Sequence, residues 1–124
     1  MKWLDRHISA PGPYLCLCRT KKEYAAAVKH LNAEEYPSFL STPQADATTH
    51  IFTKDNKLTL VVCLGDCTGR DPLEVVGLLV HEAVHVWQQY CQYYGEHSPG
   101  TEQEAYAIQA ISQELLGAYR ESLK

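Results

Sequence analysis

One long apolar segment limits the folds open to this chain, because a helix start and a helix stop bracket it. Asp71-Pro72-Leu73-Glu74 supplies an Asp cap, a proline at the first helical position and an acid in the first turn. The pattern continues for about six turns to Tyr94, and Gly95 ends it. Because this helix is apolar almost all round, we expect it to be buried within the core.

The size and charge of the chain exclude several kinds of protein. Its 124 residues suit one domain with one core, so we treat 1–124 as a single domain. Fifteen acidic residues against eleven basic ones give a charge of -4, which argues against a nucleic-acid partner. No run approaches the roughly 18 apolar residues of a membrane span. An acid and a histidine within Met1–His7 do not fit a signal peptide, so we expect a cytoplasmic protein.

Shorter patterns predict the other elements. An irregular arm ends at Pro11-Gly12-Pro13, and a strand follows over 14–18. A capping box at Thr20 and Glu23 opens a helix to about Asn32. The remaining predicted elements are strands over 50–53 and 58–64, joined by a turn at 54–57, and a last helix over 101–122. The order β-α-β-β-α-α predicts a small α+β domain with a mostly antiparallel sheet packed on helices.

Cysteine is frequent but does not indicate a disulfide framework. The five cysteines cannot all pair within one chain, and without an export signal we expect reduced thiols: Cys16, Cys18, Cys63, Cys67 and Cys91. The first four could form a four-thiolate zinc site, although neither spacing is the usual Cys-x-x-Cys. We interpret them instead as small buried hydrophobic residues.

The sequence His81-Glu82-Ala83-Val84-His85 lies in the middle of the long apolar helix. Residues four apart share a helix face, so both imidazoles can bind one metal ion. Glu82 is rotated about 100° from His81, which puts its carboxylate beside the ion as a general base. Burying these three groups requires compensation, and a metal supplies it. The alternative is a pair of core histidines satisfied by other partners.

This motif resembles that of the zincin metallopeptidases. The metzincin continuation His-x-x-Gly-x-x-His is absent, because Val86-Trp87-Gln88-Gln89-Tyr90-Cys91 follows His85. The gluzincin branch takes a glutamate from the next helix, often in a Glu-x-x-Ala context, and this chain has Glu102-Gln103-Glu104-Ala105 and Glu104-Ala105-Tyr106-Ala107. The resemblance covers about 71–116. It implies a zincin-like fold, one Zn²⁺ ion and hydrolysis of a peptide or protein substrate.

Helix geometry ranks the two glutamates. At 100° per residue, Glu104 shares a narrow stripe with Ile111 and Leu115, and Glu102 falls nearly opposite. The apolar stripe must face the core that holds the metal helix, so we predict Glu104 as the third ligand and keep Glu102 as the alternative. Without a metal, Glu104 would be a capping partner of Thr101, and Glu102 a first-turn acid.

The predicted function is therefore that of a minimal zinc metallopeptidase. His81, His85 and Glu104 would bind zinc, and Glu82 would activate water. The resemblance further implies an oxyanion-binding Tyr or His, with weak candidates at Tyr94, His97 and Tyr106, and a substrate paired to the edge of strand 58–64 or 50–53. Two other hypotheses stay open: a catalytically silent, zinc-stabilised binding or regulatory module, and a structural domain without metal.

Overall fold

A computed structural model describes residues 3–4 and 14–124. Its elements are β1 (Trp3–Leu4), β2 (Tyr14–Cys18), α1 (Lys21–His30), β3 (Ala47–Lys54), β4 (Lys57–Leu64), α2 (Pro72–Tyr94) and α3 (Thr101–Ser122). The predicted β-α-β-β-α-α order is confirmed from β2 onward. The short strand β1 was not predicted, and the predicted irregular arm ending at 11–13 lies outside the described residues.

The sheet has the strand order β1-β2-β4-β3. The two outer pairings are antiparallel, as predicted, but the central pairing of β2 with β4 is parallel, so the sheet is mixed. The β3–β4 hairpin joins the sheet through its second strand, which places β4 beside β2 in the same direction. β4 is therefore an interior strand, and its near-continuous apolar sequence fits burial on both faces.

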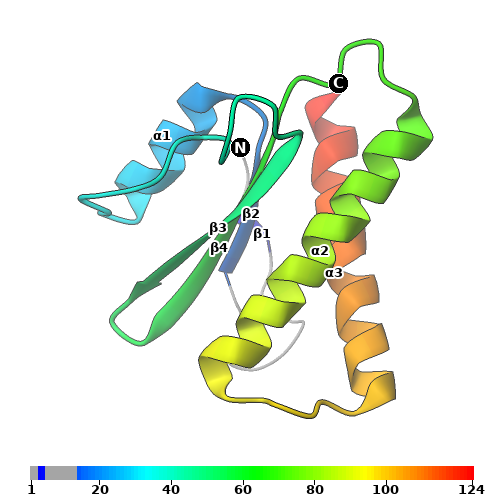
Figure 1. The fold of residues 1–124 in the computed structure, drawn as a ribbon. Helices are drawn as coiled ribbons and strands as arrows, with labels where there is room; N and C mark the ends of the chain where they lie inside the picture. Colours follow the sequence, from blue (N-terminus) through cyan, green and yellow to red (C-terminus); the bar gives the residue numbers. More distant parts are fainter. Residues whose placement is uncertain (1–2, 5–13) are drawn as a thin grey trace.

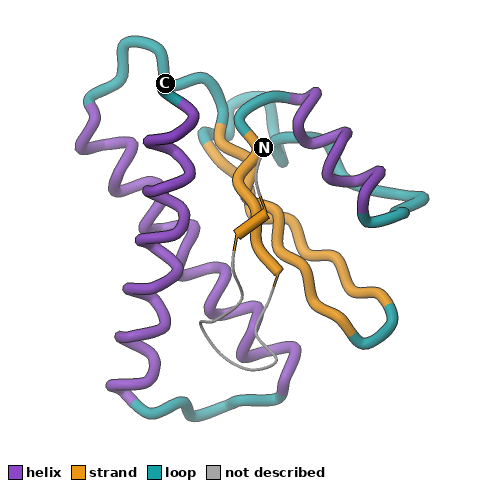
Figure 2. The backbone as a smooth tube through the Cα atoms, turned by 180° about the vertical axis from the view of Figure 1, so that it is seen from behind, coloured by secondary structure: helices purple, strands orange, loops and turns teal. Residues whose placement is uncertain are grey.

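Helices cover both faces of this sheet (Figures 1 and 2). One face of β2 and β4 packs against α2 and α3 through Leu15, Leu17, Leu60, Val62 and Leu64. The opposite face packs against α1 through Cys16, Cys18, Val61 and Cys63. The period of two along each strand thus divides the core into two clusters.

Local chemistry sets the ends of α2 and the hairpin turn. The Asp71 carboxylate accepts a hydrogen bond from the backbone N–H of Leu73 at 2.9 Å, and Gly95 ends the helix at φ 72°. Asp55 and Asn56 both have positive φ, as a two-residue hairpin turn of this kind requires. Within the described part of the chain, no helix combines the length and apolarity needed to cross a bilayer.

The five cysteines are free and buried, as predicted. The alternative four-thiolate zinc site is wrong, because Cys67 belongs to the core on the other face of the sheet and its thiol donates to the Gly65 carbonyl at 3.4 Å. Cys16, Cys18 and Cys63 lie together under α1. Hydrogen bonding to Cys18 and burial both raise the pKa of Cys16 and that of Cys63, which favours neutral thiols.

Candidate metal centre

The imidazoles of His81 and His85 meet on the outer side of α2. Their Nε2 atoms lie 3.1 Å apart and their ring centroids 4.7 Å apart. Both residues are exposed, and the His81 side chain is 64% exposed. The four-residue spacing on an uninterrupted helix brings the two rings together, as predicted.

Gln88, one helical turn after His85, orients the second imidazole. Its Oε1 atom lies 3.1 Å from Nδ1 of His85. An amide oxygen only accepts hydrogen bonds, so Nδ1 carries the proton in this assigned arrangement. In the neutral ring, Nε2 then presents a lone pair toward His81. Metal-binding histidines commonly have their other ring nitrogen held in this way.

The carboxylate of Glu82 lies beside the two imidazoles but is buried, with only 4% of the residue exposed. Its Oε1 accepts a hydrogen bond of 2.8 Å from Oγ1 of Thr49 on β3, and its Oε2 lies 3.8 Å from Nε2 of His81. Donor atoms of His81, Glu82 and His85 all lie within 4.8 Å of one another. The structure thus brings together the three predicted groups of the motif.

A small hollow of about 290 Å³ opens in front of these groups. It lies between α2, the start of β3 and the segment before β3. Its lining consists of Ser41, Ala47, Thr48, Thr49, His81, Glu82, His85 and Gln89. A polar ligand here would meet two exposed imidazoles on one side and strand β3 on the other.

Glu104 lies elsewhere in this structure. Its Oε2 accepts a hydrogen bond of 2.8 Å from Nε1 of Trp87, which is buried. Trp87 follows His85 by two residues, a rotation of about 200° around α2, so Glu104 lies on the side of the helix away from the imidazoles. Among the described residues, the potential metal-binding group does not include Glu104. Glu102 is exposed in the first turn of α3.

The predicted oxyanion-binding residues do not line the hollow either. Tyr106 is 66% exposed, Tyr94 packs against neighbouring tyrosines and His97 is an exposed loop residue. Sequence reasoning missed Thr49, since the predicted strand began at 50. The β-branched pair at Thr48 and Thr49 was the signal for an earlier start.

The donor set fits a zinc ion. Two ligands at about 2.0–2.1 Å from one tetrahedral ion are roughly 3.4 Å apart, close to the observed 3.1 Å between the Nε2 atoms. The buried carboxylate adds negative charge that a cation would offset. The described residues thus offer two imidazole nitrogens as ligands and one adjacent carboxylate.

No protein-family model matches the chain, and no curated protein or solved structure shows significant similarity to it. Family membership is therefore not assigned by comparison. The geometry of the site is what supports a function.

Proposed function

We propose that this chain is a zinc-dependent peptidase domain, as its resemblance to the gluzincins implies. The observation that carries the proposal is a buried carboxylate, Glu82, fixed by Thr49 at 2.8 Å beside two imidazoles whose Nε2 atoms are 3.1 Å apart. A general base must be held in place near the reacting water, and the Thr49 hydrogen bond together with the closeness of Glu82 to the imidazoles supports this role.

Each residue then has a distinct role. His81 and His85 would hold the ion, and Gln88 would keep the lone pair of His85 directed toward it. When bound, zinc supplies a Lewis acid that polarises a peptide carbonyl and acidifies water. Glu82 would accept the proton of the attacking water and transfer it to the leaving amine. Thr49 would prevent the carboxylate from turning away during these transfers.

The third zinc ligand remains a prediction. For Glu104 to bind the ion, it would have to release the indole of Trp87 and reach the other side of α2. The group His81, Glu82 and His85 is nevertheless sufficient to test zinc binding by itself. We therefore base the proposal on these three residues.

We place an extended peptide substrate along β3. The alternative prediction, pairing to strand 58–64, is wrong because β4 has β2 on one edge and β3 on the other. Among the described strands, β3 pairs only with β4, so its outer edge is available for β-strand addition. Thr48 and Thr49 of this strand border the hollow next to the imidazoles.

Metal analysis and peptide cleavage test the proposal. The purified chain should bind close to one zinc per molecule, and a mixed peptide library should be cleaved. Glu82→Gln should retain zinc and lose cleavage, and Glu74→Gln, an exposed acid on the same helix, should retain both. Cleavage by Glu82→Gln at the wild-type rate would disprove the role of Glu82.

One observation favours a second function, a catalytically silent zinc-stabilised binding module. Glu104 is engaged by Trp87, so a catalytic zinc site would lack the third side-chain ligand that such sites usually have. This alternative predicts zinc binding with no cleavage of any peptide by the wild type. A rise in melting temperature on adding zinc would accompany it.

A further inference from the structure

Hydrolysis of a peptide at the metal centre would create negative charge on the carbonyl oxygen. A hydrogen-bond donor aimed at that oxygen lowers the barrier, because it stabilises the charge as it develops. Tyr94, His97 and Tyr106, the predicted oxyanion-binding residues, do not line the hollow of about 290 Å³ in front of the two imidazoles. A donor for the oxyanion therefore has to come from the side chains that do line it.

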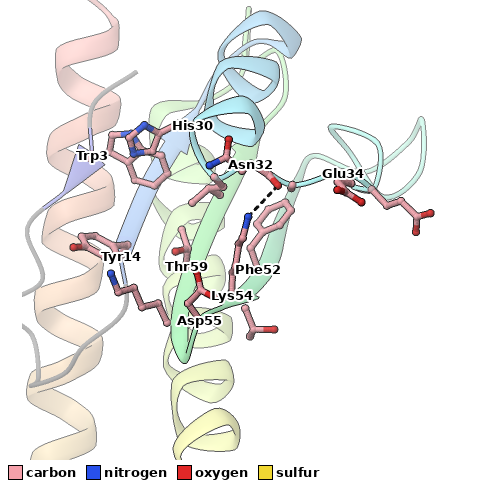
Figure 3. A pocket seen from close by; sticks show the side chains of 14 residues that line it. Trp3, Tyr14, His30, Asn32, Glu34, Phe52, Lys54, Asp55 and Thr59 are labelled. Carbon is pink, nitrogen blue, oxygen red and sulfur yellow. Dashed lines mark hydrogen bonds between the residues drawn. The ribbon is translucent and has the colours of Figure 1, made fainter.

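A larger hollow, of about 920 Å³, lies on the opposite face of the sheet (Figure 3). Its described lining comes from the sheet, the β3–β4 turn, the end of α1 and the segment after α1, and includes no residue of α2. The sheet separates this hollow from the imidazoles, so its side chains cannot reach a carbonyl bound next to them.

Helix geometry places Gln89 beside the two imidazoles. Around the axis of α2, Gln89 points about 40° from His85 and only about 20° from Glu82. It follows His85 by one turn, about 6 Å along the axis. Side chains on a helix tilt toward its N-terminus, so the amide of Gln89 extends back over the turn that contains His85. In agreement, Gln89 lines the smaller hollow together with His81, Glu82 and His85.

The side-chain amide of Gln89 is available to a ligand. Gln89 is half-buried, and within the described part of the chain its amide has no hydrogen-bond partner, yet neither polar atom is closed off from solvent. Its neighbour Gln88 differs, because Oε1 of Gln88 lies 3.1 Å from Nδ1 of His85 and Gln88 does not line the hollow. Of these two adjacent glutamines, one orients an imidazole and the other faces an open space.

The other polar groups of the hollow lie across it from α2. Oγ1 of Thr49 donates to Glu82 at 2.8 Å, and Oγ1 of Thr48 accepts from the backbone N–H of Ser41 at 2.9 Å. These three hydroxyl residues belong to β3 and the segment before it, the side on which we place the substrate. Apart from the imidazoles, the amide of Gln89 is the one side-chain N–H donor among the described lining residues.

We propose that Gln89 is a catalytic residue that donates a hydrogen bond to the oxyanion. As water adds to the carbonyl carbon, the π electrons of the C=O bond move onto the oxygen. The amide N–H of Gln89 donates to that oxygen and keeps its proton, while Glu82 takes the proton of the water. Glu82 precedes His85 by three residues and Gln89 follows it by four, so base and donor flank that imidazole. This inference rests on the proposed peptidase function.

Gln89→Met tests the proposal, because it keeps the length of the side chain and removes the N–H donor. A hydrogen bond made only in the transition state raises kcat and leaves KM nearly unchanged. We expect kcat for a cleaved peptide to fall by roughly 100- to 1,000-fold, with KM within about threefold and zinc retained. Gln92→Met, at an exposed position of the same helix, is the matched control and should keep the wild-type kcat. A kcat of Gln89→Met close to that of the wild type would overturn the proposal.

Binding of acetohydroxamate in excess zinc separates this inference from the peptidase function, because it requires no cleavage. Gln89→Met should weaken this small anion about tenfold in calorimetric titration, since a hydrogen bond to a charged oxygen is lost. Gln89→Glu, whose carboxylate has no N–H to donate at neutral pH, should weaken it at least as much and serves as the second variant if Gln89→Met fails to fold.

Two results of this titration would overturn the role of Gln89: equal affinity of the wild type and both variants, or no binding by the wild type. Weaker binding by the variants in a chain that cleaves no peptide would support the donor and disprove only the peptidase function.

Discussion

The hydrogen bond between Thr49 and Glu82 can be tested without any metal or substrate. Thr49→Val keeps the shape and β-branching of the side chain and removes only the hydroxyl that donates to the Glu82 carboxylate at 2.8 Å. Because Glu82 is only 4% exposed, water can replace this donor only poorly. The substitution therefore leaves a buried carboxylate without the hydroxyl partner that the described residues give it.

The expected cost follows from the charge on the acceptor. A hydrogen bond to a charged group contributes about 1.5–3 kcal/mol, against about 0.5–1.5 kcal/mol between neutral groups. The unfolding entropy of a chain this long is about 0.26 kcal/mol per kelvin, so the melting temperature should fall by about 6–12 °C. Thr49→Ser, which keeps the hydroxyl, should lose much less. Urea denaturation in the presence of a chelator measures each free energy of unfolding.

A double-mutant cycle isolates the pair. In a Glu82→Gln background the acceptor is neutral, so Thr49→Val should cost about 1 kcal/mol less than it does in the wild type. Equal costs in the two backgrounds would show that the hydroxyl acts on something other than the carboxylate. Wild-type stability of Thr49→Val would refute the contact itself, and with it the proposed fixing of the base.

Three further predictions rest on one hydrogen bond, one backbone conformation and the burial of the cysteines. Glu104→Gln and Trp87→Phe should each lower the free energy of unfolding by about 1–3 kcal/mol, because each breaks the hydrogen bond between the two side chains. Both variants should keep a zinc affinity within threefold of the wild type, as measured by competition with a zinc-binding dye. A large loss of zinc affinity in Glu104→Gln alone would identify Glu104 as a zinc ligand. Gly95→Ala should cost about 1 kcal/mol in urea denaturation, because φ is 72° there. Cys67 and Cys91, each 9% exposed, should be alkylated before the three thiols under α1, as peptide mass spectrometry would show; the reverse order would contradict the burial.

The elements that the sequence predicted well depend on neighbouring residues alone. The Asp71 cap, the Gly95 stop and the Asp55-Asn56 turn each act within a few residues, so their chemistry could be identified without knowing the fold. The parallel pairing of β2 with β4 could not, because about 40 residues separate the two strands. The early start of β3, which includes Thr49, was missed because Thr48 and Thr49 bury little apolar surface.

The metal centre shows the same division between local and distant information. The spacing of His81 and His85 specifies their meeting, because both lie on one helix. The apolar stripe of α3 was also predicted correctly, since Ile111 and Leu115 are buried in the core. What the pattern could not specify is which side of α2 receives that stripe, because α2 is apolar almost all round. In the structure α3 packs on the side of Trp87, so a glutamate on the correct stripe of its own helix is kept from the imidazoles by α2 itself.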